Sequence, residues 1–481
     1  MAEAAAATRR VKIVATLGPA CADVEAVTEL ASVGADVFRL NTAHLTPADI
    51  PSRVATVREA ERRVGRPLAV LCDLAGPKLR VARDAPPAAL AAGSVVSIGG
   101  TGSAAAVRVE GFDPAAECQE GCRVSLNDGR IVLVARAVRD GLLLAEVVHG
   151  GEVRPGMGVN LPEISTSLPS LTGRDRDCLA AAVAADVDLV ALSFVRTAAD
   201  VAATRALTRS LGGGQPIVAK LEKAQAVEPA ALAAILAEAD LVMVARGDLG
   251  AETAPERVPV LQKEILSRAR RVGVAAITAT EMLDSMIEDV RPTRAEAADV
   301  ANAVFDGSDA VLLTAETAIG AHPALAVAAC ARIVAEAEAH PQFGTAWSRA
   351  EPEGAGIDPV ADAVAAASGT AAAELGAAAI VCFTLSGRTA VLVARHRPGP
   401  PILALTPSPS VARRLAVSWG VTPRVVAAHP VDHERIVRLA EVEAVRAGLA
   451  RAGDTLVVTH GLPAGSGTNV LRVHRVGDGA P

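Results

Sequence analysis

Charged side chains end several short apolar runs of this 481-residue sequence, and their types suit phosphoryl and enolate chemistry. Lys220 and Glu222 are two positions apart, so on a strand both side chains would point to the same face. Glu222 and Asp248 offer the hard oxygen ligands that Mg²⁺ prefers. Mg²⁺ and Lys220 could together stabilise an enolate oxygen. Arg39 could neutralise a transferring phosphoryl group, and Thr280 could pass a proton.

Other polar residues also fall at the ends of apolar runs. Asn41, Asp73 and Glu316 each end such a run, and Gly247 precedes Asp248 in the string RGDLG. A glycine there lets a ligand approach the backbone, and free N–H groups at the start of a short helix could hold a carboxylate. Any one of these residues alone could be a solvated loop residue or a rim ion pair. Their number favours one shared site.

Alternating strands and helices are needed to position these residues. Short apolar runs rich in β-branched residues alternate with amphipathic stretches of helical period, which is typical of βαβ units. Eight such strands favour a closed (β/α)8 TIM barrel over an open doubly wound sheet, and the reactive face of a barrel is at the carboxyl ends of its strands. The expected strands are residues 11–17, 37–41, 68–73, 189–194, 216–222, 241–246, 275–280 and 310–316.

Two further units interrupt or follow the barrel. Residues 1–80 and 162–347 form the expected α/β barrel, and residues 81–161 lose the helical pattern and predict a small all-β insertion. A polar stretch at 348–357 indicates a linker. Residues 358–481 predict a C-terminal α/β domain, with strands near Ile380, Ile402 and Leu456.

Composition limits the class of protein. Half of the residues are hydrophobic (51%) and 21% are charged, which suffices for sizeable cores. The formal net charge of −7 argues against a nucleic acid or an anionic membrane as the main partner. No signal-peptide pattern or membrane-spanning apolar run is present, so we expect a cytoplasmic protein. The seven scattered cysteines do not suggest a disulfide framework.

Several strings in the right order resemble the pyruvate kinase family. Residues 12–20 read KIVATLGPA, 217–222 read IVAKLE and 243–250 read MVARGDLG. Residues 277–286 read ITATEMLDSM, and 291–296 read RPTRAE. The resemblance extends from about residue 11 to residue 475, and the strings together are highly specific.

The resemblance implies an activity and assigns roles. The family transfers a phosphoryl group from phosphoenolpyruvate to ADP with Mg²⁺, giving pyruvate and ATP in the last step of glycolysis. By similarity, Lys220 would stabilise the enolate and the transfer, Glu222 and Asp248 would bind Mg²⁺, and Arg39 would contact the phosphoryl group. Thr280 would belong to the proton path of pyruvate, and Gly247, Asp248 and Thr280 would contact substrate.

The same resemblance implies a nucleotide site and an oligomer. Asn41, His44 and Arg80 would lie near the nucleotide and its phosphates. The insertion at 81–161 would be a small β-barrel lid domain that closes over the site. Met157 stands where a lysine is common in the family, which predicts one nucleotide contact fewer. The family forms homotetramers, and residues 291–294 resemble a subunit contact, although Pro and Thr there could simply begin a helix.

The chain departs from the family where many members bind an essential K⁺. Ala43 and Leu74 replace a Ser and a Thr that would supply oxygens, leaving Asp73 as a remnant of the cation site. Lys78 replaces a Glu, and its compact ammonium could stand in for K⁺. We therefore expect catalysis that does not require K⁺. The alternative is that Lys78 only pairs with Asp73 at the rim.

Two loops of the C-terminal unit resemble the family's effector site. Thr384, Ser386, Arg388 and Thr389 lie where a strand meets a helix, a geometry that presents hydroxyl and N–H groups to phosphate. The loop 461–469 resembles its neighbour. A sugar phosphate or AMP could bind between them, although both loops could also be turns that cap strands.

Two other functions fit part of the pattern. A barrel lyase or aldolase would share the magnesium and enolate chemistry but would not need the lid, the nucleotide residues or the C-terminal unit. A catalytically silent metabolite sensor could keep the fold, which never establishes function by itself. Such a sensor would have no chemical need for Lys220, Glu222, Asp248, Thr280 and Arg39 together.

Overall fold

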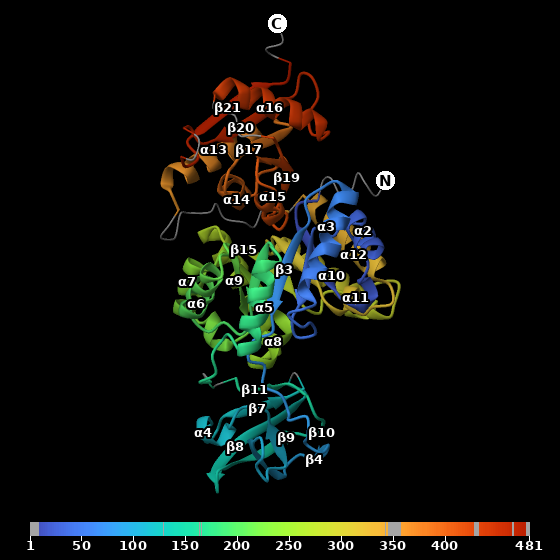
Figure 1. Cartoon of the computed structure of the whole chain (residues 1–481), viewed down its shortest axis with the longest axis vertical. Coiled ribbons are helices and arrows are strands. Elements are labelled where there is room, and N and C mark those ends of the chain that lie inside the picture. Colours follow the sequence, from blue (N-terminus) through green and yellow to red (C-terminus); the bar gives the residue numbers. More distant parts are fainter. Residues whose placement is uncertain are drawn as a thin grey trace.

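Three lobes lie in a row in the computed structural model (Figure 1). The barrel is in the middle, with the inserted β sheet at one end and the C-terminal unit at the other. The structure describes residues 9–127, 129–162, 164, 166–341, 343–344, 357–427, 432–463 and 466–477. Nearly all of the predicted linker at 348–357 lies outside these residues, as do positions 464 and 465 of the loop 461–469.

Eight parallel strands close into a barrel, in the order β1-β16-β15-β14-β13-β12-β3-β2. Their side chains are almost all buried, because helices cover the outside and side chains fill the inside. The predicted (β/α)8 architecture is confirmed. The strands are β1 (Lys12–Leu17), β2 (Val37–Asn41), β3 (Ala69–Leu74), β12 (Leu189–Leu192), β13 (Ile217–Leu221), β14 (Leu241–Ala245), β15 (Ala275–Ala279) and β16 (Ala310–Leu313).

Helices on the outside of the barrel begin and end at residues that favour helix termini. Thr172 and Thr293 each form a capping box with an acidic residue three positions later, which satisfies free N–H groups at the helix start. Gly65 and Gly273 end two helices in the left-handed conformation. These helices are α2 (Val24–Ser32), α3 (Ile50–Val64), α5 (Gly173–Ala184), α6 (Ala198–Ser210), α7 (Pro229–Glu238), α9 (Val258–Val272), α10 (Arg294–Phe305) and α12 (Pro323–Ala339).

The C-terminal unit covers the amino-end opening of the barrel. Ala416 and Val417 pack into the same apolar cluster as the inward-facing Val14 and Leu71. Lys12 donates a hydrogen bond from Nζ to the carbonyl of Val421, at 2.8 Å. The carboxyl ends of the strands therefore remain as the end where a site can open, and β3 leads from that end into the lid (Figure 1).

The inserted lid is built on one barrel-like six-stranded sheet in the order β11-β7-β8-β9-β5-β6, beside a two-stranded sheet β10-β4. Alternating residues such as Leu133 and Ala135 face a buried core, as expected for a sheet with one solvated face. The lid elements are β4 (Ala88–Leu90), β5 (Val95–Gly100), β6 (Val107–Val109), α4 (Pro114–Glu117), β7 (Arg123–Leu126), β8 (Ile131–Arg139), β9 (Leu142–His149), β10 (Gly151–Val153) and β11 (Val159–Asn160).

The C-terminal unit has a five-stranded sheet in the order β19-β18-β17-β20-β21, parallel except for β21. The strands predicted near Ile380, Ile402 and Leu456 are confirmed. Within the described residues, no helix combines the length and apolar character needed to cross a membrane. The elements are α13 (Pro359–Glu374), β17 (Ala379–Phe383), α14 (Arg388–Arg395), β18 (Ile402–Thr406), α15 (Pro409–Leu415), β19 (Val421–Val425), α16 (His433–Arg446), β20 (Thr455–His460) and β21 (Val470–Arg475).

Candidate active site

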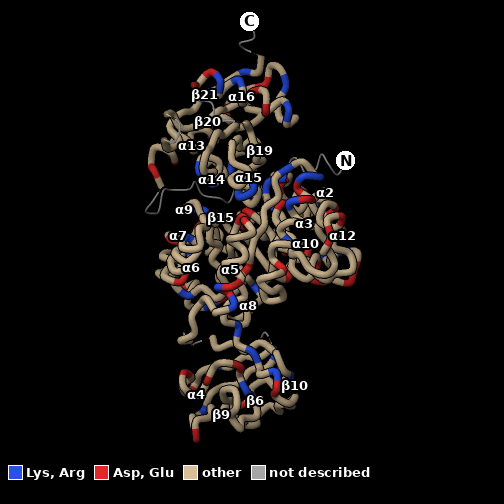
Figure 2. The backbone as a smooth tube through the Cα atoms, viewed as in Figure 1, with Lys and Arg blue, Asp and Glu red and all other residues tan. Residues whose placement is uncertain are grey.

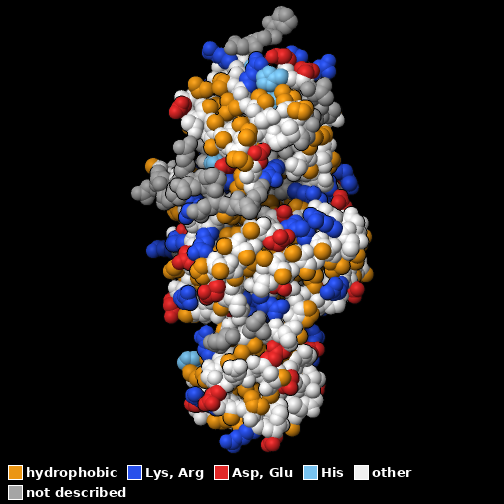
Figure 3. Space-filling model, turned by 90° about the vertical axis from the view of Figure 1, so that its left-hand side faces the viewer, with side chains coloured by type: hydrophobic (Ala, Val, Ile, Leu, Met, Phe, Trp, Pro, Cys, Tyr) orange, Lys and Arg blue, Asp and Glu red, His pale blue; other side chains and the backbone are white. Residues whose placement is uncertain are grey.

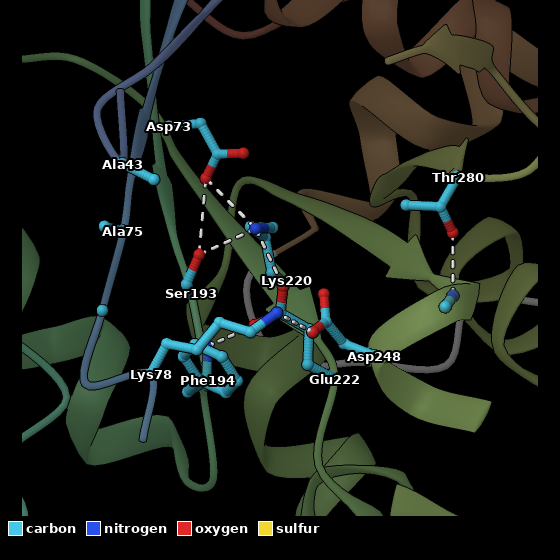
Figure 4. Close-up of polar contacts among 12 residues, drawn as sticks. Ala43, Asp73, Ala75, Lys78, Ser193, Phe194, Lys220, Glu222, Asp248 and Thr280 are labelled. Carbon is cyan, nitrogen blue, oxygen red and sulfur yellow. Dashed lines mark hydrogen bonds and ion pairs between the residues drawn. The ribbon is translucent and has the colours of Figure 1, made fainter. Parts of the chain in front are cut away.

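Lys220 lies at the centre of a buried polar cluster at the carboxyl ends of the barrel strands (Figure 4). Its Nζ is 2.8 Å from Glu222 Oε1 and 3.3 Å from Asp73 Oδ1. It also donates a hydrogen bond to Ser193 Oγ at 2.7 Å. The structure thus brings together three side chains that the sequence predicted, from β3 and from the end of β13.

Arg39 shares Asp73 with Lys220. Its Nε lies 2.7 Å from Asp73 Oδ2, and its Nη1 donates to Thr16 Oγ1 at 3.3 Å. Neighbouring strands β1, β2 and β3 therefore fix the guanidinium. Two cationic groups meet at one carboxylate, which suits a site for an anionic substrate.

Burial and neighbouring charges set the protonation states. Burial alone would raise the pKa of Asp73, but the charges of Lys220 and Arg39 outweigh it and hold this pKa below its usual value. Burial would lower the pKa of Lys220, but Asp73 and Glu222 outweigh it and raise this pKa. Lys220 is therefore an ammonium group at neutral pH.

Glu222 differs from Asp73 in the direction of its pKa, which is raised rather than lowered. Burial raises its pKa, and the charge of Asp248 adds to the effect, although Lys220 and the backbone N–H of Phe194 act in the opposite direction. Phe194 donates that N–H to Glu222 Oε2 at 2.6 Å. A divalent cation beside Glu222 and Asp248 would relieve this repulsion. Mg²⁺ needs only one or two protein carboxylates besides water and substrate oxygens, so these two residues fit it.

Helix α8 (Arg246–Glu252) follows β14 and carries Asp248. Gly247 and Asp248 lie in the first turn of this short helix, which begins at Arg246. The Gly247 N–H is already bonded to Thr280 Oγ1 at 2.8 Å. Thr280 has a φ of 72°, an uncommon conformation for a β-branched residue, and Arg246 holds it by donating to its carbonyl at 2.7 Å. The Thr280 hydroxyl is therefore fixed next to α8.

Lys78 reaches the same helix from the connection that follows β3. Its Nζ lies 3.0 Å from Asp248 Oδ1, so its ionic contact is with Asp248 rather than with Asp73 (Figure 4). Gly76, at a φ of 68°, lets this connection pass close to the barrel rim. A Cβ at position 76 would lie 2.8 Å from the ring of Phe194, so a larger residue would push the connection away.

The surroundings of Asp73 contain fewer side-chain oxygens than the family pattern leads one to expect. Ala43 and Leu74 contribute none, and Figure 4 shows Ala43 on the side of Asp73 away from Lys220. Thr42 does have a hydroxyl, but it donates to the Asp73 carbonyl at 2.9 Å and accepts from the Ala75 N–H. This hydroxyl holds the backbone between β2 and β3 together.

The residues predicted to lie near a nucleotide occupy two places. Asn41 ends β2, and His44 lies in the turn after it, where the His44 N–H donates to the Asn41 carbonyl at 3.2 Å. Arg80 lies on the first lid connection and donates to the Gly156 carbonyl at 3.0 Å. The structure therefore brings Asn41 and His44 together, whereas Arg80 is hydrogen-bonded to the backbone of the lid.

Two neighbours of Lys220 and Glu222 were missed. Ser193 directly follows strand β12, so the rule that polar residues end barrel strands would have found it. Phe194, which donates its N–H to Glu222, has a φ of 53° that no sequence pattern indicated. Glu316 was grouped with the strand-end residues, but its carboxylate accepts from the N–H groups of Leu283 and Thr314. It therefore supports the backbone of its own turn and of the segment after β15.

A cavity of about 720 Å³ opens beside this cluster. Lys78, Gly247 and Asp248 line one end of it, and it continues between α9 and α10. Its volume suits a small-molecule ligand. Figure 2 shows charged residues of both signs at α8, where barrel and lid meet, and Figure 3 shows Lys and Arg side chains near the constriction between these two lobes.

Comparisons with known proteins agree with this geometry. Residues 8–327 match the model of the pyruvate kinase barrel domain, and residues 362–474 match that of the pyruvate kinase alpha/beta domain. The pyruvate kinases of Geobacillus stearothermophilus and Mycobacterium tuberculosis (strain H37Rv) are each 38% identical to this chain. The matches cover 98% of this chain, with 81% of the first relative and 99% of the second. The pyruvate kinase of Agrobacterium vitis is 40% identical, over 97% of each chain. The chain belongs to the pyruvate kinase family.

Membership makes the chain a kinase, an enzyme of the transferase class. The family's barrel match spans the strands that carry Arg39, Asp73, Lys220 and Glu222, so the cluster lies within the region that defines the family. The lid falls inside the same match.

A second cavity, of about 610 Å³, lies in the unit that matches the pyruvate kinase alpha/beta domain. Thr384, Ser386, Arg388 and Thr389 line it together with the loop after β20. Thr389 Oγ1 lies 2.7 Å from Thr468 Oγ1, so a hydrogen bond joins the two loops. The cavity thus lies between the two loops, and a ligand in it stays a prediction.

Proposed function

We propose that this member of the pyruvate kinase family transfers a phosphoryl group from phosphoenolpyruvate to ADP, giving pyruvate and ATP at the last step of glycolysis. The observation that carries the proposal is the Lys220 ammonium, held between Asp73 and Glu222 at 3.3 and 2.8 Å in a buried site. A fixed positive charge in a water-poor site stabilises an oxygen that becomes negative during the reaction. The enolate oxygen left after phosphoryl transfer is such an atom.

Glu222 and Asp248 would hold Mg²⁺. When bound, the cation supplies charge neutralisation for phosphate and enolate oxygens. Burial and the charge of Asp248 raise the pKa of Glu222, although Lys220 opposes them, so a cation beside this carboxylate would favour its charged form. Arg39, fixed by Asp73, would face the transferring phosphoryl group and neutralise part of its charge.

Thr280 would serve the final proton transfer. Converting the enolate to pyruvate requires a proton on carbon, and the Thr280 hydroxyl is fixed by the Gly247 N–H. Because the Thr280 oxygen accepts that N–H, its own proton remains available for donation. Gly247 and Asp248 on α8 would contact substrate, and Asn41, His44 and Arg80 would contact nucleotide phosphates.

Catalysis without K⁺ is part of the proposal. The Lys78 ammonium, 3.0 Å from Asp248, supplies a monovalent positive charge at the rim of the site. Ala43 and Leu74 have no side-chain oxygen to offer K⁺, and Asp73 is already paired with Arg39 and Lys220.

The remaining parts of the proposal concern organisation. Residues 81–161 act as a lid on the barrel formed by 1–80 and 162–347, and residues 358–481 bind a sugar phosphate or AMP as effector. The enzyme is a cytosolic homotetramer. Support comes from the family membership and from the cavity between the two C-terminal loops.

The test follows ³¹P resonances during incubation of the protein with phosphoenolpyruvate, ADP and Mg²⁺. The proposal expects the phosphoenolpyruvate signal to convert into the γ-phosphate of ATP, and conversion to stop in Glu222→Gln, which lacks a charged ligand. Release of free phosphate without ATP would indicate another reaction. No conversion with either a sugar phosphate or AMP present would favour the silent sensor.

A further inference from the structure

A buried ion pair lies beside the predicted magnesium ligands without being one of them. Lys223 Nζ is 2.7 Å from Glu252 Oε2, and the two side chains are only 10% and 1% exposed. Lys223 directly follows Glu222 in the chain. Glu252 lies one helical turn after Asp248 on the same helix, α8. Each partner is thus attached to one predicted ligand.

This connection has a geometric consequence. Residues four apart on a helix lie on the same face, so a force on Glu252 turns the face that also carries Asp248. The ion pair holds that face toward the segment after β13, where Glu222 lies. The ion pair therefore joins the segment that carries Glu222 to the helix that carries Asp248.

The lid is attached to the same pair. Asn160 Nδ2 donates to Glu252 Oε1 at 2.9 Å, and Asn160 ends β11, the last strand of the lid. Because the carboxylate only accepts, the amide must turn its NH₂ group to it. Asn160 Oδ1 is left buried without a hydrogen-bond partner among the described residues. Such orphaned acceptors are uncommon in folded proteins and call for a functional explanation.

The two chain segments that join the lid to the barrel, one before and one after the lid, both contact α8. The first connection carries Lys78, which pairs with Asp248, and the second begins at Asn160, which binds Glu252. The Val159 N–H donates to the Leu79 carbonyl at 2.9 Å and joins the two connections to each other. A movement of the lid must therefore act on the helix that carries Asp248.

We propose that Lys223 and Glu252 are positioning residues for the divalent cation. Their ion pair sets the spacing of Glu222 and Asp248, and Asn160 ties the lid to that spacing. The inference rests on the proposed function, in which these two carboxylates bind Mg²⁺. Residues that orient metal ligands from outside the coordination sphere commonly determine the affinity for the metal.

The experiment measures Mn²⁺ binding to the free full-length protein by electron paramagnetic resonance, without substrate. Mn²⁺ suits the same oxygen ligands as Mg²⁺. Lys223→Met should weaken binding about 10- to 100-fold, the usual effect of losing such a partner. Lys223→Arg, which keeps the charge, should recover most of the affinity. Arg205→Met is the control, because Arg205 pairs with Asp240 at the same 2.7 Å on the outer face of the barrel.

The outcomes separate this proposal from the proposed function. Wild-type Mn²⁺ affinity in Lys223→Met, or an equal loss in Arg205→Met, would overturn the positioning role. If Lys223→Met does not fold, the double variant Lys223→Met/Glu252→Gln removes both charges and should show the same weak binding. If the protein forms no pyruvate but its Mn²⁺ affinities follow this pattern, the proposed function is wrong and the positioning role of Lys223 and Glu252 stands.

A second readout tests the lid. Hydrogen exchange of the peptide covering residues 156–162 should slow when Mg²⁺ binds to the wild type, because the cation fixes α8 and with it Glu252. In Asn160→Ala the same peptide should not respond to Mg²⁺. Equal slowing in both proteins would show that Asn160 does not couple the lid to the metal site.

Discussion

The ammonium group of Lys78 lies 3.0 Å from the carboxylate of Asp248, although the two residues are 170 positions apart in the sequence. This contact joins the first lid connection to the helix that carries a predicted magnesium ligand. A fixed cation thus stands at the rim of a cluster of three carboxylates, those of Asp73, Glu222 and Asp248 (Figure 4). Catalysis without K⁺ stays a prediction, and this contact indicates which residue to change in order to test it.

Lys78→Glu should sharply reduce activity in K⁺-free buffer. The substitution removes the cation and places a negative charge beside Asp248, which the anionic substrates would have to overcome. We expect a loss of at least about 100-fold in kcat/KM, the size that follows loss of one well-placed electrostatic group. Steady-state assays with and without K⁺ measure it. Unchanged activity in Lys78→Glu would refute the role of Lys78.

Lys220→Met should abolish turnover and also destabilise the barrel. It leaves Glu222 and Asp73 buried with less compensation, and breaking a buried pair costs about 3–5 kcal/mol. Ser193→Ala is the milder companion, since it removes only one hydrogen bond to the ammonium, worth about 1.5–3 kcal/mol. Thermal unfolding midpoints and kcat should rank wild type, Ser193→Ala, Lys220→Met. The reverse order would contradict the central place of Lys220.

Thr280→Ala should lower kcat by about 100-fold, the lower range for a positioned proton donor. Thr280→Ser keeps the hydroxyl and should retain most of the rate. Incorporation of solvent deuterium into the methyl group of pyruvate reports the proton step directly. If Thr280→Ala exchanges this group as fast as the wild type, Thr280 is not on the proton path.

Because Lys12 is buried, we expect the free energy of unfolding to change in alkaline solution. Burial lowers its pKa from 10.5 to about 8, and Asp36 opposes the effect only in part. The folded protein releases this proton at lower pH than the unfolded chain, so between about pH 8 and 10.5 the unfolded chain holds more protons and the free energy of unfolding rises with pH. Relative to Lys12→Met, wild type should gain roughly 3 kcal/mol over that range. Urea unfolding of both proteins at several pH values measures the difference, and a constant difference would contradict it.

An effector should act through the C-terminal cavity. We expect AMP or a sugar phosphate to lower the KM for phosphoenolpyruvate, and Arg388→Ala to remove this effect because Arg388 lines the cavity. Arg435→Ala, at the exposed ion pair with Asp432 on α16, is the control and should respond as wild type does. Activity that no tested phosphate changes would argue against regulation at this site.

Much of the site could be predicted because a barrel brings the ends of its strands together. Asp73, Lys220 and Glu222 were chosen by position alone, and the structure places them within ion-pair distance. The contact of Asn160 with Glu252 could not be predicted, since it depends on how the lid folds back over the barrel. The same is true of Lys78 and Asp248.

The two edge strands of the C-terminal sheet were not predicted from the sequence. Residues 421–425 form β19 at one edge of the sheet, although Pro423 within them argues against a strand. An edge strand tolerates proline because the backbone on its outer side has no neighbouring strand and needs no N–H donor there. The opposite edge strand β21 was also missed, and it pairs antiparallel with β20 in a unit whose other strands are parallel.

The most direct test measures pyruvate formation from phosphoenolpyruvate and ADP with Mg²⁺, in parallel in K⁺ buffer and in buffer free of K⁺. We predict equal rates in the two buffers, with Lys220→Met inactive in both. Activity only with K⁺ would keep the kinase and contradict the role of Lys78. Absence of pyruvate in both buffers, with AMP and a sugar phosphate also tried, would contradict the central claim.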